Sequence, residues 1–167
     1  MLPPQASTCF FCQYQALEKN LGDVEFLGER RSFSAAAKRF GEFRHALEEH
    51  LSAEEAVLVP LYVENARGDA GQLVEQFRSS RARVDGAMND VSAALSQADH
   101  SAFCQSMSAL DTALEHHRAI EEASVHPALD TVLVDDSNWE SARRLARLAA
   151  CRHDSPSRLG VTSAALQ

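Results

Sequence analysis

A repeat of 67 residues within the chain limits its possible folds more than any other feature of the sequence. Residues 46–60 read ALEEHLSAEEAVLVP and residues 113–127 read ALEHHRAIEEASVHP, with eight of fifteen positions identical. The same offset relates apolar positions outside these segments, for example Phe43 and Leu110. A period of this length indicates two copies of one structural unit that pack against each other.

Four long segments carry apolar residues every three or four positions, the spacing that places them on one face of a helix. The segments run over about 9–28, 33–60, 69–95 and 99–127. We expect Pro60, followed by Arg67-Gly68-Asp69, to close the second segment. Only 7 glycines and 5 prolines interrupt the 167 residues, which favours long helices over short strands. The sequence therefore predicts an all-α protein, an up-down-up-down four-helix bundle made of two tandem helical hairpins.

The rest of the chain is expected to flank this bundle. We predict an irregular lead-in over residues 1–8, the bundle over 9–134, an additional C-terminal helix over 135–153 and a flexible tail over 154–167. Trp139 and Leu145 share one face of the additional helix, so we expect them to pack it against the outside of the bundle.

Charge and hydropathy exclude several classes of function. Asp plus Glu outnumber Lys plus Arg by 24 to 16, and the net charge of −8 is opposite in sign to that of surfaces that bind nucleic acid or anionic membranes. No apolar run approaches the roughly 20 residues that span a bilayer. The first residues lack the basic and apolar regions of a secretory signal. We expect a cytoplasmic protein with no nucleic-acid or membrane partner, and the sequence indicates no particular protein partner.

Both repeats contain the pattern His-x-x-x-Glu, as His50 with Glu54 and as His117 with Glu121. Residues four apart lie on one helix face, about 6 Å apart along the axis. Both pairs interrupt an apolar stripe, and buried carboxylates need a cation or hydrogen-bond donors. Because the second and fourth helices are diagonal in an up-down bundle, we expect the four side chains to converge in the core. Two imidazoles and two carboxylates suit iron, zinc or manganese.

These residues resemble the hemerythrin, or HHE, family over roughly residues 9–130. The resemblance implies a four-helix bundle that holds a non-haem di-iron centre, with the two glutamates bridging the irons, and a role linked to oxygen, peroxide, nitric oxide or iron. The family pattern has one histidine on the first helix, one on the third, and His-x-x-x-Glu on the second and fourth. His50, Glu54, His117 and Glu121 match that pattern as metal ligands.

The other two ligand positions of the family differ in this chain. The hydrophobic phase and the 67-residue offset place Tyr14 and Arg81 there, so both are expected to line the site. A guanidinium stays protonated and does not ligate a metal. We predict that Arg81 hydrogen-bonds Glu54, Glu121 or both, and that the chain binds zero or one metal ion rather than two. Tyr14 is either a phenolate ligand to ferric iron or a hydrogen-bond donor to a carboxylate.

Two alternatives to a metal protein with altered coordination remain open. One is a metal-free bundle that acts as a regulatory or interaction module. The other is a thiol or zinc sensor built on Cys9 and Cys12, with Cys151 and His153 completing a zinc site. Cys104 is expected to be a buried thiol. The assigned cofactor is non-haem iron, with zinc or no metal as alternatives and a small diatomic molecule as a further ligand, and no residue is assigned a catalytic role.

Overall fold

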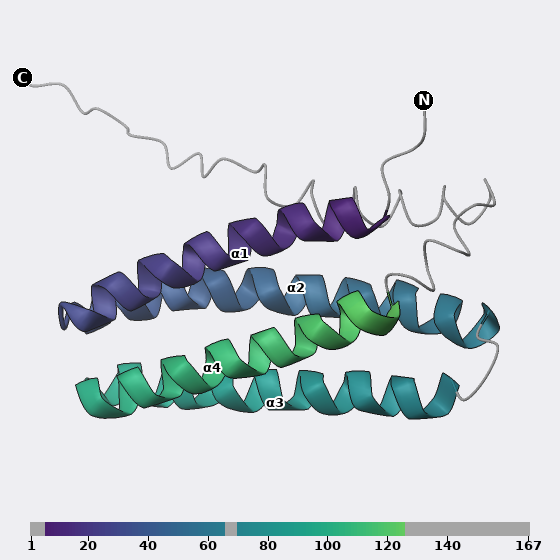
Figure 1. The fold of residues 1–167 in the computed structure, drawn as a ribbon. Helices are drawn as coiled ribbons and strands as arrows, with labels where there is room; N and C mark the ends of the chain where they lie inside the picture. The colour runs from purple at the N-terminus through teal and green to yellow at the C-terminus, as the bar shows by residue number, and fades with distance from the viewer. Residues whose placement is uncertain (1–5, 66–69, 126–167) are drawn as a thin grey trace, which may run out of the picture.

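The computed structural model describes residues 6–65 and 70–125, which form four long helices (Figure 1). The helices are α1 (Ala6–Glu29), α2 (Phe33–Asn65), α3 (Ala70–Gln97) and α4 (His100–Ile120), and α4 continues into a π-helical turn, η1 (Glu121–Val125). Helix α1 packs on α2, α2 on α3, α3 on α4, and α4 on α1. Helices α2 and α4 therefore lie on a diagonal. The predicted all-α bundle of two helical hairpins is confirmed for this part of the chain.

Two helix boundaries differ from those expected. Helix α1 begins at Ala6, three residues before the predicted start, because no proline or glycine lies between Ala6 and Cys9 to prevent it. Helix α2 continues through Pro60 to Asn65, so the expectation that Pro60 closes it is wrong. Proline has a helix-compatible φ, and its missing N–H removes one backbone hydrogen bond. The predicted helix over 135–153 and the tail over 154–167 lie outside the described residues.

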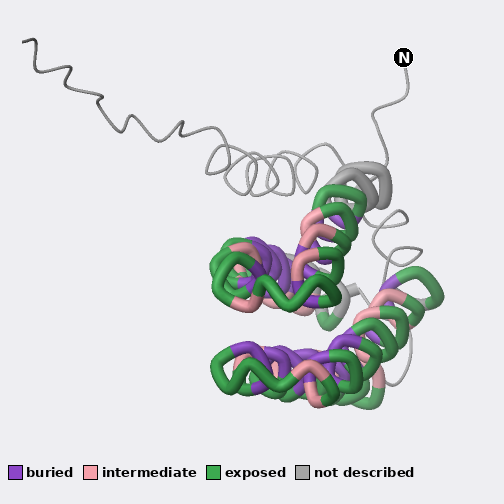
Figure 2. The backbone as a smooth tube through the Cα atoms, turned by 90° about the vertical axis from the view of Figure 1, so that its left-hand side faces the viewer, coloured by how far each residue is buried: buried purple, intermediate pink, exposed green. Residues whose placement is uncertain are grey.

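Each helix turns one stripe of buried residues toward the interior of the bundle (Figure 2), and most residues of this stripe are apolar. Burying a side chain of leucine, valine or phenylalanine stabilises the fold by about 1.5–3 kcal/mol. The stripe consists mainly of Leu17, Leu21, Val24, Phe40, Phe43, Leu47, Leu51, Val84, Met88, Val91, Phe103, Met107 and Leu110. On α2 and α4 the stripe continues with histidine and glutamate, which places the polar site at one end of the apolar core.

The turns within the two hairpins are themselves copies of one another. Arg31 and Ala98, which are 67 residues apart, both have a left-handed backbone, with φ of 59° and 53°. After each of them the chain closes with the same hydrogen bond, from Ser32 N–H to Leu27 O (2.9 Å) and from Asp99 N–H to Ala94 O (3.2 Å). This is the Schellman geometry of helix C-termini. The repeat in the sequence is thus also a repeat in the backbone.

A close approach of α1 and α4 depends on Gly28. A β-carbon at position 28 would lie 2.2 Å from ring atoms of Phe103, whereas one at Gly22 on the same helix would meet nothing within 4 Å. We therefore expect Gly28→Ala to destabilise the protein by about 1–3 kcal/mol through overpacking. Gly22→Ala is expected to stabilise it by about 0.5–1 kcal/mol, because alanine loses less backbone entropy in a helix. Urea unfolding of the two variants measures this, and equal effects would contradict the close packing.

No helix among residues 6–65 and 70–125 is both long and apolar enough to cross a membrane.

Candidate metal centre

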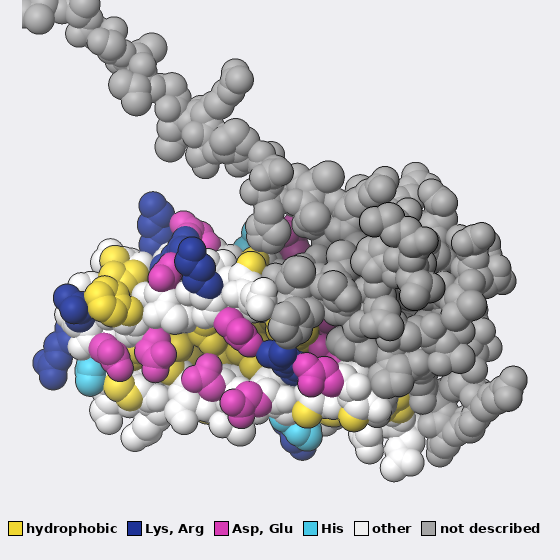
Figure 3. Space-filling view, turned by 45° about the horizontal axis from the view of Figure 1, so that its top comes forward, with side chains coloured by type: hydrophobic (Ala, Val, Ile, Leu, Met, Phe, Trp, Pro, Cys, Tyr) yellow, Lys and Arg dark blue, Asp and Glu magenta, His cyan; other side chains and the backbone are white. Residues whose placement is uncertain are grey.

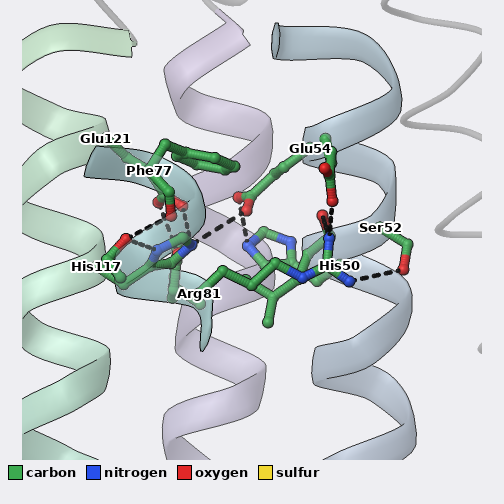
Figure 4. A network of polar contacts seen from close by, with 11 residues as sticks. His50, Ser52, Glu54, Phe77, Arg81, His117 and Glu121 are labelled. Atoms are coloured by element: carbon green, nitrogen blue, oxygen red, sulfur yellow. Dashed lines mark hydrogen bonds and ion pairs between the residues drawn. The ribbon is translucent and has the colours of Figure 1, made fainter. Parts of the chain in front are cut away.

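Four ionisable side chains converge between the diagonal helices (Figure 4). His50 and Glu54 come from successive turns of α2, His117 comes from the last turn of α4, and Glu121 is the first residue of η1. All four are buried, and both glutamates have no exposed surface. The apolar stripes of α2 and α4 carry these residues inward, because each occupies a position that continues the three-and-four spacing.

Glu54 lies between the two imidazoles. Its Oε1 is 2.8 Å from His50 Nε2, and its Oε2 is 3.6 Å from His117 Nε2. His117 Nε2 is also 2.8 Å from Glu121 Oε1. One ligand atom each from Glu54, His117 and Glu121 lies within 4.8 Å of the others. Bonds of about 2.0–2.2 Å to a metal hold ligand atoms up to about 4.4 Å apart, so this cluster is close to the size of one coordination shell.

Several polar atoms of this cluster have no hydrogen-bond partner although they are close to one another. Both carboxylate oxygens of Glu54, Oε1 of Glu121 and Nε2 of His117 are buried, and none takes part in a contact with hydrogen-bond geometry. An unsatisfied buried polar group costs about 1–3 kcal/mol, and a charged one costs more. Ligand atoms that converge on one point of the core are the arrangement that a cation requires. The residues present therefore fit a metal ion.

Burial and mutual repulsion shift the protonation equilibria of these groups. Burial alone would lower the pKa of His117, but Glu121 and Glu54 outweigh it and raise that pKa to about 9. Burial, followed by the charge of Glu54, raises the pKa of Glu121 above its ordinary value. Burial also acts to raise the pKa of Glu54, but the two imidazoles outweigh it and lower that pKa. Without a metal, the site attracts a proton in its place.

Tyr14 lies at the site as expected, and it acts there as a hydrogen-bond donor. Its hydroxyl donates a hydrogen bond of 2.6 Å to Oε2 of Glu121, and its ring meets that of His50 edge-on, with 4.8 Å between the centroids. Burial, followed by the charges of Glu54 and Glu121, raises the pKa of Tyr14 far above its ordinary value. Of the two alternatives open for Tyr14, the structure shows the neutral phenol that hydrogen-bonds a carboxylate.

The prediction that Arg81 hydrogen-bonds Glu54 or Glu121 is wrong. Its guanidinium donates to the carboxylate of Glu55, to the carbonyl oxygen of Leu51 (3.2 Å) and to the hydroxyl of Ser52 (3.5 Å). Arg81 thus lies on the outer side of the α2–α3 contact and does not bond Glu54 or Glu121. The reason is the rotation of α3 about its axis, which points the neighbouring residue inward in place of Arg81.

Two residues of α3 that the sequence did not indicate as site residues face His117. Ser80 is buried, and its Oγ is 2.7 Å from His117 Nδ1. Phe77 is also buried, and its ring centroid is 4.9 Å from that of His117. Phe77 precedes Arg81 by one turn, and Ser80 precedes it by one residue. A serine in the apolar stripe of α3 was the only signal in the sequence that pointed to this contact.

The two His-x-x-x-Glu units differ in their backbone. Glu54 lies in the regular α-helix α2, whereas Glu121 begins η1. Single π-helical turns inside α-helices are rare and occur frequently at functional sites. The π-helical turn thus begins at the glutamate that Tyr14 and His117 contact.

The cysteines contribute nothing to this cluster among the described residues. Cys9 and Cys12 belong to α1, but their side chains lie outside the described part of the structure, as does Cys151. Cys104 is exposed on α4, so the expectation of a buried thiol is wrong. Its position falls outside the stripe of Phe103 and Met107, which face the core.

A groove of about 210 Å³ between α1 and α4 leads to Tyr14. Its apolar lining comes from leucines of α1, α2 and α4 and from Phe43, and three acidic side chains, Glu18, Asp111 and Glu115, also line it. Figure 3 shows hydrophobic side chains bordered by acidic ones on this face of the bundle. Because the hydroxyl of Tyr14 bonds Glu121, the groove reaches within one side chain of the buried cluster.

The fold and the site together define a helical bundle with a buried cluster of histidines and glutamates whose arrangement fits a cation. A family model, the hemerythrin HHE cation-binding domain, matches residues 10–129. The chain belongs to this family, as its resemblance predicted, and the match includes α2, α3, α4 and the part of α1 from Phe10 onward. No curated protein and no solved structure matches the chain.

Proposed function

We propose that this chain binds a single transition-metal ion, iron or zinc, through Glu54, His117 and Glu121, with His50 next to Glu54 as a further donor. The observation that carries the proposal is the set of buried carboxylate oxygens and the imidazole nitrogen that lack hydrogen-bond partners at one point of the core. When bound, the ion supplies the positive charge that the two glutamates lack. Tyr14 orients Glu121 by hydrogen-bonding the oxygen that does not face His117.

One ion per chain is expected because the second half of a di-iron ligand set is missing. Tyr14 and Phe77 occupy the sides of the site on α1 and α3, and neither offers a charged or imidazole ligand. Around a second ion, only His50 and Oε1 of Glu54 would be available within the cluster. A protein site for iron or zinc typically has three or more protein ligands.

Metal content of the full chain, purified without a histidine tag, tests this proposal. Elemental analysis is expected to find about one iron or zinc per chain after loading and removal of excess metal. Two ions per chain would contradict the single site, and no retained ion would favour the metal-free regulatory module. Zinc that is lost when Cys9 and Cys12 are changed to serine, but retained in Glu54→Gln, would instead favour the thiol site.

Adding an imidazole on α1 and one on α3, the two helices on which this chain lacks the family's histidines, is expected to raise the metal content. Phe77 faces His117, so Phe77→His adds an imidazole inside the core, and Tyr14→His frees the oxygen of Glu121. We expect the double variant to bind about two ions per chain by elemental analysis. Arg81→His is the matched control, since Arg81 is directed to Glu55. An increase in Arg81→His that equals the increase in Phe77→His would contradict the orientation of α3.

The groove at Tyr14 supports an extension of this proposal to sensing a small molecule. The leucines and Phe43 that line this groove suit a small neutral molecule, such as nitric oxide or oxygen, and the groove ends at Tyr14, which hydrogen-bonds Glu121. Nitric oxide added to the ferrous protein is expected to give the electron paramagnetic resonance signal of an iron nitrosyl. An unchanged spectrum in protein with full iron content would contradict this sensing role.

A further inference from the structure

Ser80 makes two hydrogen bonds, and the chemical nature of its two partners determines the direction of each. Its side chain is 1% exposed, so water does not compete for it. Its Oγ is 2.7 Å from the carbonyl oxygen of Phe77, one turn earlier on α3, and 2.7 Å from Nδ1 of His117 on α4. A serine hydroxyl has one proton to donate and lone pairs to accept.

The contact with Phe77 determines where that proton lies. A carbonyl oxygen only accepts, so the hydroxyl of Ser80 donates its proton to Phe77. No proton is left on Oγ for His117. The bond between them exists only if Nδ1 of His117 carries a proton and donates it to Oγ. In the neutral ring, the other nitrogen, Nε2, then has a free lone pair.

Nε2 is the atom that faces the carboxylates. It is 2.8 Å from Oε1 of Glu121 and 3.6 Å from Oε2 of Glu54, without hydrogen-bond geometry to either. A metal-binding histidine is commonly held in this way, by a hydrogen bond from its second nitrogen that sets the tautomer and the ring orientation.

We propose that Ser80 is the positioning residue of the site: its Oγ accepts a hydrogen bond from Nδ1–H of His117 and donates one to the carbonyl oxygen of Phe77, which presents Nε2 of His117 to the cation. The role of Ser80 in metal binding rests on the proposed function, whereas the direction of its hydrogen bond with His117 is a property of the metal-free protein. Through Ser80, α3 contributes to the site although it lacks the family's histidine.

The chain offers a matched control for Ser80. Ser106 is also buried, and its Oγ donates to the carbonyl oxygen of Phe103, three residues earlier, at 3.0 Å. Ser80→Ala and Ser106→Ala therefore remove the same kind of intrahelical hydrogen bond. Only Ser80→Ala also removes the acceptor for His117. Any effect that both variants share is structural, and any effect confined to Ser80→Ala arises from the histidine.

Nuclear magnetic resonance of the full, metal-free chain with ¹⁵N-labelled histidine, recorded at pH 10, where the ring of His117 is neutral, tests the hydrogen-bond direction. The signals of His117 are identified by their loss in His117→Gln. We expect a protonated Nδ1 whose hydrogen exchanges slowly with water in the wild type and in Ser106→Ala, and rapidly in Ser80→Ala. An unprotonated Nδ1 in the wild type, or equal exchange in the two alanine variants, would overturn the inference.

Zinc affinity, measured by competition with a chelator, tests the consequence for metal binding. Ser80→Ala is expected to weaken binding by about 10–100-fold, the usual effect of removing a partner of a metal ligand, and Ser106→Ala by less than about twofold. Ser80→Thr retains the hydroxyl and is expected to recover most of the affinity. Equal losses in both alanine variants would overturn the positioning role. Should the wild type bind no zinc, the proposed function fails, while the nuclear magnetic resonance result still decides the role of Ser80.

Discussion

Replacing Glu54 by glutamine is expected to lower the affinity of the chain for zinc by at least about 100-fold. Glu54 is the residue whose two oxygens face both imidazoles, so the change removes a ligand and one of the two charges that attract a cation. Loss of a group that only supports a ligand typically costs 10–100-fold, and loss of the ligand itself is expected to exceed that range. Isothermal titration with zinc, or competition with a chelator, measures the difference.

The neighbouring residue is the control for this prediction. Glu55 follows Glu54 directly but is directed outward, where it pairs with Arg81 and Arg78 at partial exposure. Glu55→Gln removes the same charge from the protein and is expected to change zinc affinity by less than about twofold. Comparable losses in Glu54→Gln and Glu55→Gln would show that net charge, rather than the buried cluster, governs metal binding.

The metal-free protein is expected to lose stability as the pH rises, with a loss of about 3 kcal/mol that arises from His117. Its pKa is about 9 in the folded protein and about 6.5 in the unfolded chain. Between these values the folded state binds the extra proton, so the stabilisation is complete below pH 6.5 and is lost as the pH approaches 9. The raised pKa of Glu121 acts in the same direction at lower pH, because the folded state also favours its protonated form.

Urea unfolding at pH 6 and at pH 9.5, with and without zinc, measures this loss. Zinc is expected to abolish most of the loss, because the metal takes the lone pair that the proton otherwise occupies. His117→Gln is expected to lose little stability over the same range, whereas His116→Gln, which changes an exposed neighbour, should behave as the wild type. A wild-type stability that stays constant from pH 6 to pH 9.5 would contradict the site's affinity for a proton.

Much of the bundle could be predicted from local patterns. The three-and-four spacing of apolar residues identified the helices, and the 67-residue offset paired them, because both depend only on the helical period and on duplication. The turns at Arg31 and Ala98 show how far the duplication extends into the backbone. Pro60 was misjudged, since proline has a helix-compatible φ and its missing N–H removes one backbone hydrogen bond without ending the helix here.

The same duplication led to the error at Arg81. The offset equates Tyr14 with Arg81, and Tyr14 does lie at the site. In α3, however, the inward sequence Phe77–Ser80–Val84 and the alternative Phe77–Arg81–Val84 both have spacings of three and four. Ser80 and Arg81 differ by about 100° around the helix axis. Periodicity alone does not distinguish two such neighbours, and the repeat favoured the wrong one.

The sequence by itself determined that two His-x-x-x-Glu pairs interrupt the apolar stripes of diagonal helices, and thereby which residues meet in the core. Only the tertiary structure decided which groups surround them: a hydroxyl from Tyr14 on Glu121, a hydroxyl from Ser80 on His117, and Arg81 outside with Glu55. The physical reason is that a helix's rotation about its own axis is set by packing against all its neighbours at once. Contacts with several helices therefore decide which of two adjacent residues is buried and which is exposed. No single segment of the sequence contains those contacts.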